Sequence, residues 1–557
     1  MIEKFVKKQF HKINPATWAL LAMGFMVYIP FLSKQLNCAD TNVYGYLYHI
    51  NGYGYEDALG RFLIKYFVQW RNDINSNVLT VGLSIVFLCI LSEIITRIFE
   101  FKSTFTSFMV GALLLFSAAS ADLFTYVYTT DVYCFAFLLV GVGTYFLLKK
   151  EEIWAKVAAA VLYIASMSFY QAYIGFALFI ITVFLLKSLW TRKNELVENK
   201  SLRDEASVKT VFFRDIVPAF IYYLVVGISM VVYLVLLKLL DKLSLIQMES
   251  TRGTDNMMAN FLVNFFNEVR EAYRGFFEYF FTDIINFNSW FGRKYINLGI
   301  LLLLFVVLLT LVINNKIYKN VVSLVTGIVL VAVMPLILCL IVILSPESSI
   351  YAETGVLMLP FINGFYMLPV ILLDGDIILR NVQPDEGDVI GNKKQDIIVS
   401  TLDFGCKLFV TLSIIIMIVF VEVFAKEVEL QQNQLSQLAN RVVTRIEMMD
   451  DYVPNEKVLV VGRPHDGFYP LPNSRFELIT KNMISHYSQI FGASDQISEG
   501  WIKAFDYYVG VKYEAVTPEE RDALLGSSEV MDMDIFPAEN SIRKVGDVTV
   551  VKFSETY

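Results

Sequence analysis

The stretch "INLGILLLLFVVLLTLVIN" (296–314) contains no charged residue. A helix needs about 20 mostly apolar residues to cross the hydrocarbon core of a bilayer, so this stretch predicts a membrane-spanning helix. Ten further runs have the same character: 15–34, 76–97, 104–121, 131–148, 155–170, 172–190, 216–240, 320–344, 355–373 and 397–424. The sequence therefore predicts an all-α polytopic membrane protein with about eleven transmembrane helices.

The overall composition agrees with a membrane protein. The 557 residues are 56% hydrophobic and 15% aromatic, and the mean hydropathy is +0.53, which is too apolar for a soluble globular protein. The net charge of −8 is small for this length and gives no reason to expect a nucleic-acid partner. The five cysteines lie in or beside apolar runs without metal-ligand spacing, so we expect them to be buried apolar side chains.

The distribution of lysine and arginine predicts the orientation in the membrane. Four lysines precede the first apolar run, and seven lysines and arginines lie in 187–214. The alternating loops 122–131 and 345–354 contain none. Because basic residues favour cytoplasmic loops, we expect a cytoplasmic N-terminus. Eleven crossings then place the residues after about 425 outside.

Two long loops on the outer side each contain an amphipathic pattern. In loop 35–75, apolar residues recur at helical spacing over 59–70, and Arg61 lies on the other face. Loop 241–295 repeats the pattern over 258–280. Amphipathic helices of this kind lie in the membrane interface, so we expect one interfacial helix in each loop.

The last part of the chain has a different character. It begins with a polar, helix-like stretch and continues with two strand-like runs, "KVLVVG" (457–462) and "DVTVVKF" (547–553). Its length suffices for one small soluble domain. The sequence thus predicts a transmembrane domain at 1–424 and a small extracytoplasmic α/β domain at 425–557.

Charged residues are rare inside the predicted spans and gather at their outer ends. One exception is Asp403 with Lys407, which lie four apart in the last span and predict an ion pair. An outer carboxylate can act as a general base for a sugar hydroxyl, and an arginine can bind a lipid phosphate. The outer carboxylates are Asp40, Glu56, Asp57, Asp122, Asp131, Glu347 and Glu353.

Several short motifs resemble one family of membrane enzymes. They are "CADTN" (38–42), "GRF" (60–62), "SFYQAY" (168–173), and in the tail "LANRVVTRIE" (438–447) and "DIFPAENSIRKVGDVTVVKF" (534–553). Through roughly 36–75, 105–175 and the tail, the chain resembles the serotype-converting O-antigen glucosyltransferases of the Gtr type II family, within the membrane-embedded GT-C class. Many relatives carry paired acids where Ala39 precedes Asp40 here, which leaves open whether Asp40 acts alone or with Glu56 or Asp57.

The resemblance implies a GT-C-like fold for 1–424 in a bacterial cell membrane. It further implies inverting transfer of a sugar, expected to be glucose, from a polyprenyl-phosphate-linked donor to a cell-surface or lipid-linked glycan on the outer face. No cofactor is expected, and a divalent metal is left open. The chain contains neither a P-loop nor a dinucleotide-binding fingerprint, which agrees with the absence of a nucleotide site.

The same resemblance implies roles for individual residues. We expect Asp40 to be the general base, with Asp122, Glu56 and Asp57 as the other candidate acids. Arg61 is the first candidate for the donor phosphate, and Arg252, Arg270 and Arg293 on the second outer loop are reserves. Candidate substrate contacts are Tyr170, Gln171 and Tyr44.

Each assignment has a structural alternative. Asp40 is also a suitable N-cap for the helix that would follow it. Arg61 is also placed to extend to lipid headgroups, and Asp122 to be the solvated end of the third span. The Tyr-Gln pair at 170–171 is equally suited to satisfying a tight turn, and the tyrosines of 44–55 to forming an interfacial belt.

Two other functions compete with a glycosyltransferase. A flippase or exporter of polyprenyl-linked saccharide needs a polar path through the bilayer, which the uncharged spans disfavour. A glycan polymerase or ligase uses the same outer surface with a saccharide-diphosphate lipid donor, and the sequence separates it poorly from a glycosyltransferase. The expected partners are the lipid-linked donor, a surface glycan acceptor, membrane lipid, and a polyprenyl-phosphate glycosyltransferase and flippase that supply the donor.

Overall fold

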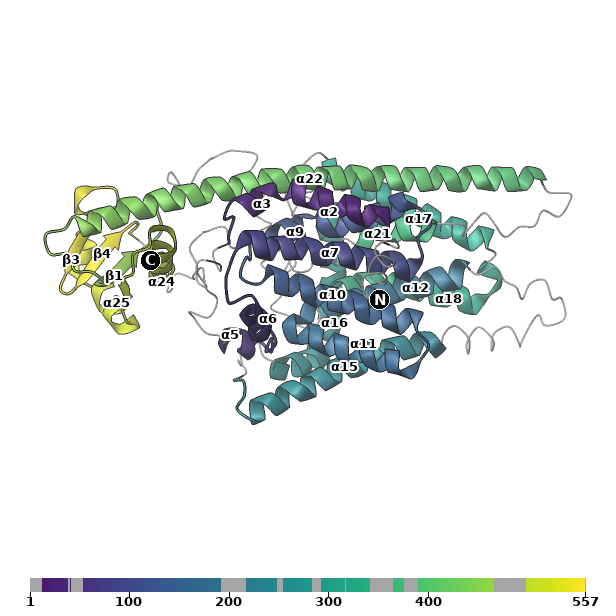
Figure 1. Ribbon diagram of the computed structural model, residues 1–557, viewed down its shortest axis with the longest axis horizontal. Helices are drawn as coiled ribbons and strands as arrows, with labels where there is room; N and C mark the ends of the chain where they lie inside the picture. Colours follow the sequence, from purple (N-terminus) through teal and green to yellow (C-terminus); the bar gives the residue numbers. More distant parts are fainter. Residues whose placement is uncertain are drawn as a thin grey trace, which may run out of the picture.

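The computed structural model describes residues 13–38, 41, 54–191, 217–247, 254–282, 292–315, 317–340, 364–374, 389–464 and 497–555. These parts form a helical bundle and a small α/β unit (Figure 1). One helix, α22 (Val389–Glu447), runs along the bundle and continues into the α/β unit.

The described part of the bundle contains eleven apolar helices of two lengths. Seven are long and apolar enough to cross a membrane: α7 (Asn77–Phe99), α10 (Thr130–Lys149), α12 (Ile174–Thr191) with the preceding turn η2 (Gln171–Tyr173), α15 (Val217–Lys242), α17 (Arg293–Asn314), α18 (Val321–Leu338) and α22. Four are shorter: α2 (Pro15–Val27), α8 (Thr104–Leu115), α11 (Ile153–Phe169) and α21 (Gly364–Leu373). This content fits a polytopic membrane protein.

Two of the predicted spans are broken in the structure. The first contains α2 and α3 (Ile29–Ser33), because Tyr28 leaves the helical conformation and Pro30 lacks an N–H for the helix ladder. The third contains α8 and α9 (Ala118–Leu123). Here the Ser117 hydroxyl accepts a hydrogen bond from the Ser120 N–H at 3.0 Å and so caps a new helix.

Hydrogen bonds of polar side chains connect the central helices α10 and α11 and fix their position along each other. The Ser166 hydroxyl of α11 donates to the Ala136 carbonyl of α10 at 2.8 Å. The hydroxyls of Thr144 on α10 and Tyr163 on α11 lie 3.0 Å apart. Such bonds hold helices together in lipid, where apolar surface gives little preference for one partner over another.

The predicted interfacial helix over 59–70 is wrong as one continuous helix. The structure has α5 (Gly54–Ala58) and α6 (Ile64–Trp70), separated by a turn. Gly60 in this turn has φ +80°, a left-handed conformation that suits glycine and ends α5. Arg61 therefore lies on the connection between two short helices, not on a helix face.

The predicted helix of the second loop is confirmed as α16 (Thr254–Phe281), which packs against α17 and α18. Phe276 and Phe280 are buried in this contact, whereas Phe266 is 85% exposed. One apolar side of α16 therefore lies on the bundle, and Phe266 lies outside this contact.

The α/β unit contains a four-stranded sheet in the order β2-β1-β4-β3. The two predicted strand-like runs are confirmed as β1 (Lys457–Val461) and β4 (Val548–Lys552), which pair in parallel. β2 (Glu514–Ala515) adds in parallel to β1, and β3 (Ile542–Val545) is antiparallel to β4. The helices around the sheet are α24 (Ile497–Val509), α25 (Pro518–Leu525) and α26 (Ser528–Met531).

The end of α22 belongs to the core of the α/β unit. Its residues Leu435, Val442 and Ile446 are buried against Trp501 of α24 and Phe553 after β4. The predicted boundary at 424/425 therefore falls inside one continuous helix. The predicted ion pair within α22 is confirmed, with Lys407 Nζ 2.6 Å from an Asp403 carboxylate oxygen.

Candidate functional site

The turn between α5 and α6 lies at the end of the bundle nearest the α/β unit (Figure 1). Arg61 in this turn belongs to a polar cluster. The Arg61 Nη1 donates to a Glu56 carboxylate oxygen at 3.0 Å and to the Tyr133 hydroxyl at 3.0 Å. The Arg61 side chain is 18% exposed and that of Glu56 is 3% exposed. The guanidinium is thus largely enclosed and oriented by a carboxylate.

Two tyrosines form an aromatic support for Arg61. The Arg61 Cζ lies 4.8 Å from the centre of the Tyr170 ring and 5.8 Å from that of Tyr133, and the two ring centres are 4.3 Å apart. Arginine over an aromatic face is a favourable cation–π arrangement. Burial acts to lower the pKa of Arg61, but Tyr133 and Glu56 outweigh it and hold this pKa well above its usual value. The Arg61 guanidinium therefore stays protonated beside the Glu56 carboxylate.

Gln171 holds the turn that carries Arg61. Its Nε2 donates to the Leu59 carbonyl at 2.7 Å and to the Tyr233 hydroxyl at 2.8 Å, and that hydroxyl donates to the Gly60 carbonyl at 3.1 Å. A Cβ at Gly60 would meet the Tyr233 hydroxyl at 2.8 Å. Gln171 thus satisfies the turn that carries Arg61, not its own turn, and it connects this turn to α15.

One edge of the Arg61 guanidinium makes no hydrogen bond. Both of its described bonds use Nη1. Its Nε is buried and has no hydrogen-bond partner within the described ranges. The Nε and Nη2 atoms together form the fork that binds phosphate or carboxylate through two bonds. A phosphate oxygen that bonded Nη2 would therefore leave the Glu56 ion pair intact.

Asp122 lies on α9 and is buried, with 2% of its surface exposed. Its alternative assignment as a solvated helix end is therefore wrong. The Asp122 carbonyl accepts bonds from the Thr125 N–H and hydroxyl at 2.9 and 2.7 Å. The Thr125 carbonyl in turn accepts the Cys38 N–H and the Thr41 hydroxyl, each at 3.0 Å. Residues 38 and 41 therefore lie against the segment that follows α9.

The remaining candidates are separate or lie outside the described residues. Asp57 is paired with Lys65 at 3.1 Å, away from the guanidinium of Arg61. Arg270 on α16 is 73% exposed and pairs with Glu271. The candidates outside the described residues are Asp40, Tyr44, Arg252, Glu347 and Glu353.

Arg293 forms a second buried cluster at the start of α17. It donates to the Tyr366 hydroxyl of α21 at 2.9 Å, and that hydroxyl donates to Asn297 at 2.8 Å. The Asn297 amide donates to the Phe280 carbonyl at the end of α16. Arg293 thus joins three helices, and no described contact brings it together with Arg61.

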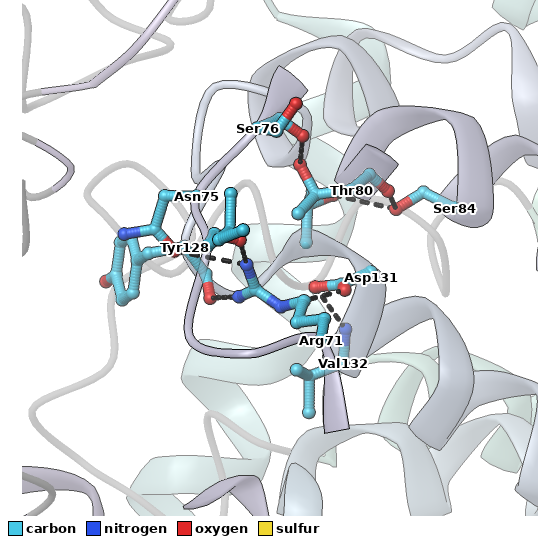
Figure 2. A network of polar contacts seen from close by, with 10 residues as sticks. Arg71, Asn75, Ser76, Thr80, Ser84, Tyr128, Asp131 and Val132 are labelled. Atoms are coloured by element: carbon cyan, nitrogen blue, oxygen red, sulfur yellow. Dashed lines mark hydrogen bonds and ion pairs between the residues drawn. The ribbon is translucent and has the colours of Figure 1, made fainter. Parts of the chain in front are cut away.

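A buried ion pair near the site was missed by sequence reasoning. Figure 2 shows the Arg71 guanidinium between Asp131 at the start of α10 and the carbonyl of Tyr128. The Arg71 Nε lies 3.2 Å from the Asp131 carboxylate, and both side chains are fully buried. The same arginine binds Asn75 and the carbonyl of Ile74. It thereby fastens the end of loop 35–75 to α10.

Tyr133 and Tyr233 were also missed. Each lies inside an apolar run of a predicted span, where a tyrosine is usually a packing residue. The only available signal was a hydroxyl that needs a partner inside a span. In the described parts of the chain, no three His, Cys, Asp or Glu side chains gather as metal ligands.

The bundle fits a polytopic membrane protein, with a largely buried arginine–glutamate pair at one end of its helices. The family model described as glucosyl transferase GtrII matches residues 47–366, more than half of the chain, and the chain belongs to this family. It is thus a membrane glucosyltransferase. The match includes Glu56, Arg61 and Asp122, and position 40 and the α/β unit lie outside it. Comparisons with curated proteins and with solved structures gave no match.

Proposed function

We propose that this glucosyltransferase takes its sugar from a polyprenyl-phosphate donor and transfers it, with inversion, to a surface or lipid-linked glycan on the outer face of the membrane. The observation that carries the proposal is the Arg61 cluster. A largely enclosed guanidinium, oriented by Glu56 and Tyr170, uses only Nη1 in its described hydrogen bonds and leaves Nη2 for an anion. A lipid monophosphate presents the oxygens that such a fork binds.

In this proposal Arg61 stabilises the leaving group. The acceptor hydroxyl oxygen attacks C1 of the sugar, and the bond from C1 to the phosphate oxygen breaks. The electron pair of that bond stays on the phosphate, whose charge Arg61 neutralises. Because a permanent positive charge close to the phosphate favours the separated state, Arg61 contributes to the chemical step as well as to donor binding.

A carboxylate takes the proton of the acceptor hydroxyl. Asp40 remains the first candidate on sequence, and Asp122 is the second. What supports this choice is the pair of bonds from Cys38 and Thr41 to the Thr125 carbonyl, beside the buried Asp122. Glu56 is engaged by Arg61, so we assign it the orientation of the guanidinium rather than proton transfer.

The test is product analysis with protein in lipid vesicles and a radiolabelled polyprenyl-phosphate glucose. We expect glucose to appear on an added cell-surface glycan fraction, with no transfer when UDP-glucose replaces the lipid donor. Transfer only from a saccharide-diphosphate lipid would indicate a polymerase or ligase. Movement of the lipid-linked sugar across the vesicle membrane without any new glycan product would indicate a flippase.

The same assay tests the base. Asp40→Asn should lower the turnover by roughly 10²- to 10⁴-fold, the usual effect of losing a general base, while the protein still inserts. Asp122→Asn is the matched variant. Near-normal turnover of Asp40→Asn together with loss in Asp122→Asn would assign the proton transfer to Asp122.

A further inference from the structure

The α/β unit touches the segment that leads from the first membrane helices toward position 40. We call residues 34–38 the entry segment. The Asn37 side-chain amide donates to the Tyr507 hydroxyl of α24. The Gln432 Nε2 of α22 donates to the Asn37 carbonyl at 3.1 Å. Asn37 is 1% exposed, so these bonds lie in a closed contact between two parts of the chain.

The other side of the entry segment is held by the bundle. The Cys38 N–H donates to the Thr125 carbonyl at 3.0 Å, and the Asn77 amide of α7 donates to the Leu36 carbonyl at 3.5 Å. At its start, Lys34 pairs with Glu429 of α22 at 2.6 Å. The entry segment is thus bonded on one side to the membrane helices and on the other to α22 and α24.

α22 makes this arrangement stiff. Phe424 and Val428 belong to the core of the bundle, and Leu435 and Val442 belong to the core of the α/β unit. Phe424 also stacks on Phe31 of α3, with ring centres 6.2 Å apart. Because one uninterrupted helix is buried in both cores, the helix offers no hinge between them.

We propose that the α/β unit is needed for sugar transfer because it fixes the position of the entry segment. Tyr507 and Gln432 are the positioning residues, since both bond to Asn37. The consequence for turnover rests on the proposed function. The reason is the continuity of the chain. The entry segment ends at Cys38, and Cys38 and Thr41 are both bonded to the Thr125 carbonyl beside Asp122. A shift of Asn37 would therefore shift the backbone on which the candidate base is carried.

The contact itself is tested without substrate. Asn37→Cys and Tyr507→Cys are combined in the full-length protein, and native membranes are treated with a short bismaleimide. We expect a cross-link between the two positions, detected after a protease cut introduced between 440 and 500. The single variants are controls for reaction with Cys38. A double variant that reacts at both cysteines but forms no cross-link would overturn the contact.

The positioning role is tested by kinetics of Tyr507→Phe, which removes only the hydroxyl. We expect kcat to fall roughly 5- to 10-fold, the usual scale for one lost hydrogen bond, with the donor KM unchanged. Gln432→Met should act in the same direction. Tyr513→Phe is the matched control, because the buried Tyr513 hydroxyl has no hydrogen-bond partner in the described parts. The melting temperature of Tyr507→Phe should equal that of this control.

The outcomes separate the two claims. A cross-link together with equal kcat for Tyr507→Phe and Tyr513→Phe would overturn the positioning role while the glucosyl transfer stands. A kcat loss that is matched by an equal loss of folded protein would also overturn it. If the wild-type protein transfers no sugar from the lipid donor, the proposed function fails and the positioning role fails with it, whereas the cross-link still reports on the contact.

Discussion

At the scale of residues, the orientation of Arg61 is the property that an experiment can isolate. Arg61→Lys keeps the positive charge but loses the planar fork and the stacking on Tyr170. We expect the donor KM to rise and kcat to fall, with a combined loss in kcat/KM of roughly 10- to 100-fold, and an unchanged acceptor KM. Steady-state kinetics with donor and acceptor varied separately measure both effects.

The control for this substitution is Arg274→Lys. Arg274 lies on α16, is 62% exposed, is no candidate for the donor phosphate, and makes surface pairs with Glu271 and Glu278 that a lysine can keep, so the change should be silent. Wild-type kinetics of Arg61→Lys would remove Arg61 from the donor site. Arg293 and Arg252 would then be the next arginines to test.

At the scale of elements, the sequence predicted those features that depend on local composition. The apolar runs, the amphipathic helix α16 and the strands β1 and β4 are set by hydrophobicity and its period, which can be read from neighbouring residues. The prediction of one helix over 59–70 was wrong although the apolar residues have helical spacing. Gly60 adopts a left-handed conformation that interrupts the helix. The Arg61 motif was found from resemblance, whereas Tyr133 and Tyr233 join it only through packing between distant helices.

The Arg71–Asp131 pair is an element-scale device, because it fixes the start of α10 to the end of loop 35–75 (Figure 2). Asp131→Asn leaves a fully buried guanidinium without its counter-charge. Breaking such a pair typically costs about 3–5 kcal/mol, so we expect a clearly lower melting temperature in detergent. The double variant Arg71→Met with Asp131→Leu should recover part of the loss, because it leaves no charge buried alone.

Thermal unfolding of the purified variants checks this prediction. Asp403→Asn is a suitable control, since Asp403 and Lys407 are only partly buried and their pair lies within one helix. If Asp131→Asn has the same melting temperature as the wild-type protein, the Arg71–Asp131 pair does not hold the loop. A double variant that is less stable than Asp131→Asn would show that the bonds of Arg71 to the Ile74 and Tyr128 carbonyls, or misfit of the apolar side chains, outweigh the removal of the unpaired charge.

At the scale of the whole molecule, the number of membrane crossings can be determined by experiment. Among the described residues, the seven long helices and the eleven apolar helices both give an odd number, so a cytoplasmic N-terminus places the α/β unit outside in either case. The side of the membrane on which position 102 lies distinguishes the two counts. If only the long helices cross, the turn after α7 is external, whereas with eleven crossings α2 also crosses before α7 and that turn is cytoplasmic.

The contacts of this turn favour a crossing by α8 together with α9. Glu100 pairs with Lys149 at 2.6 Å, so the turn after α7 and the end of α10 lie at the same end of the bundle. The chain between Glu100 and Lys149 therefore runs to the opposite end of the bundle and returns. α8 has 12 residues and spans about 18 Å, less than the hydrocarbon core of about 30 Å. The broken pair α8 and α9 can complete the passage because other helices cover its free backbone groups.

Cysteine labelling checks this arrangement, and all five native cysteines are buried and form no disulfide, which keeps the background low. We expect Ala523→Cys on α25 to react with a membrane-impermeant maleimide in intact cells. Lys102→Cys and Lys150→Cys should react only after the membrane is permeabilised. Reaction of Lys102→Cys in intact cells, with Lys150→Cys still protected, would mean that α8 does not take part in a crossing. Because these two positions lie on turns joined by the Glu100–Lys149 ion pair, such a result would also contradict that contact.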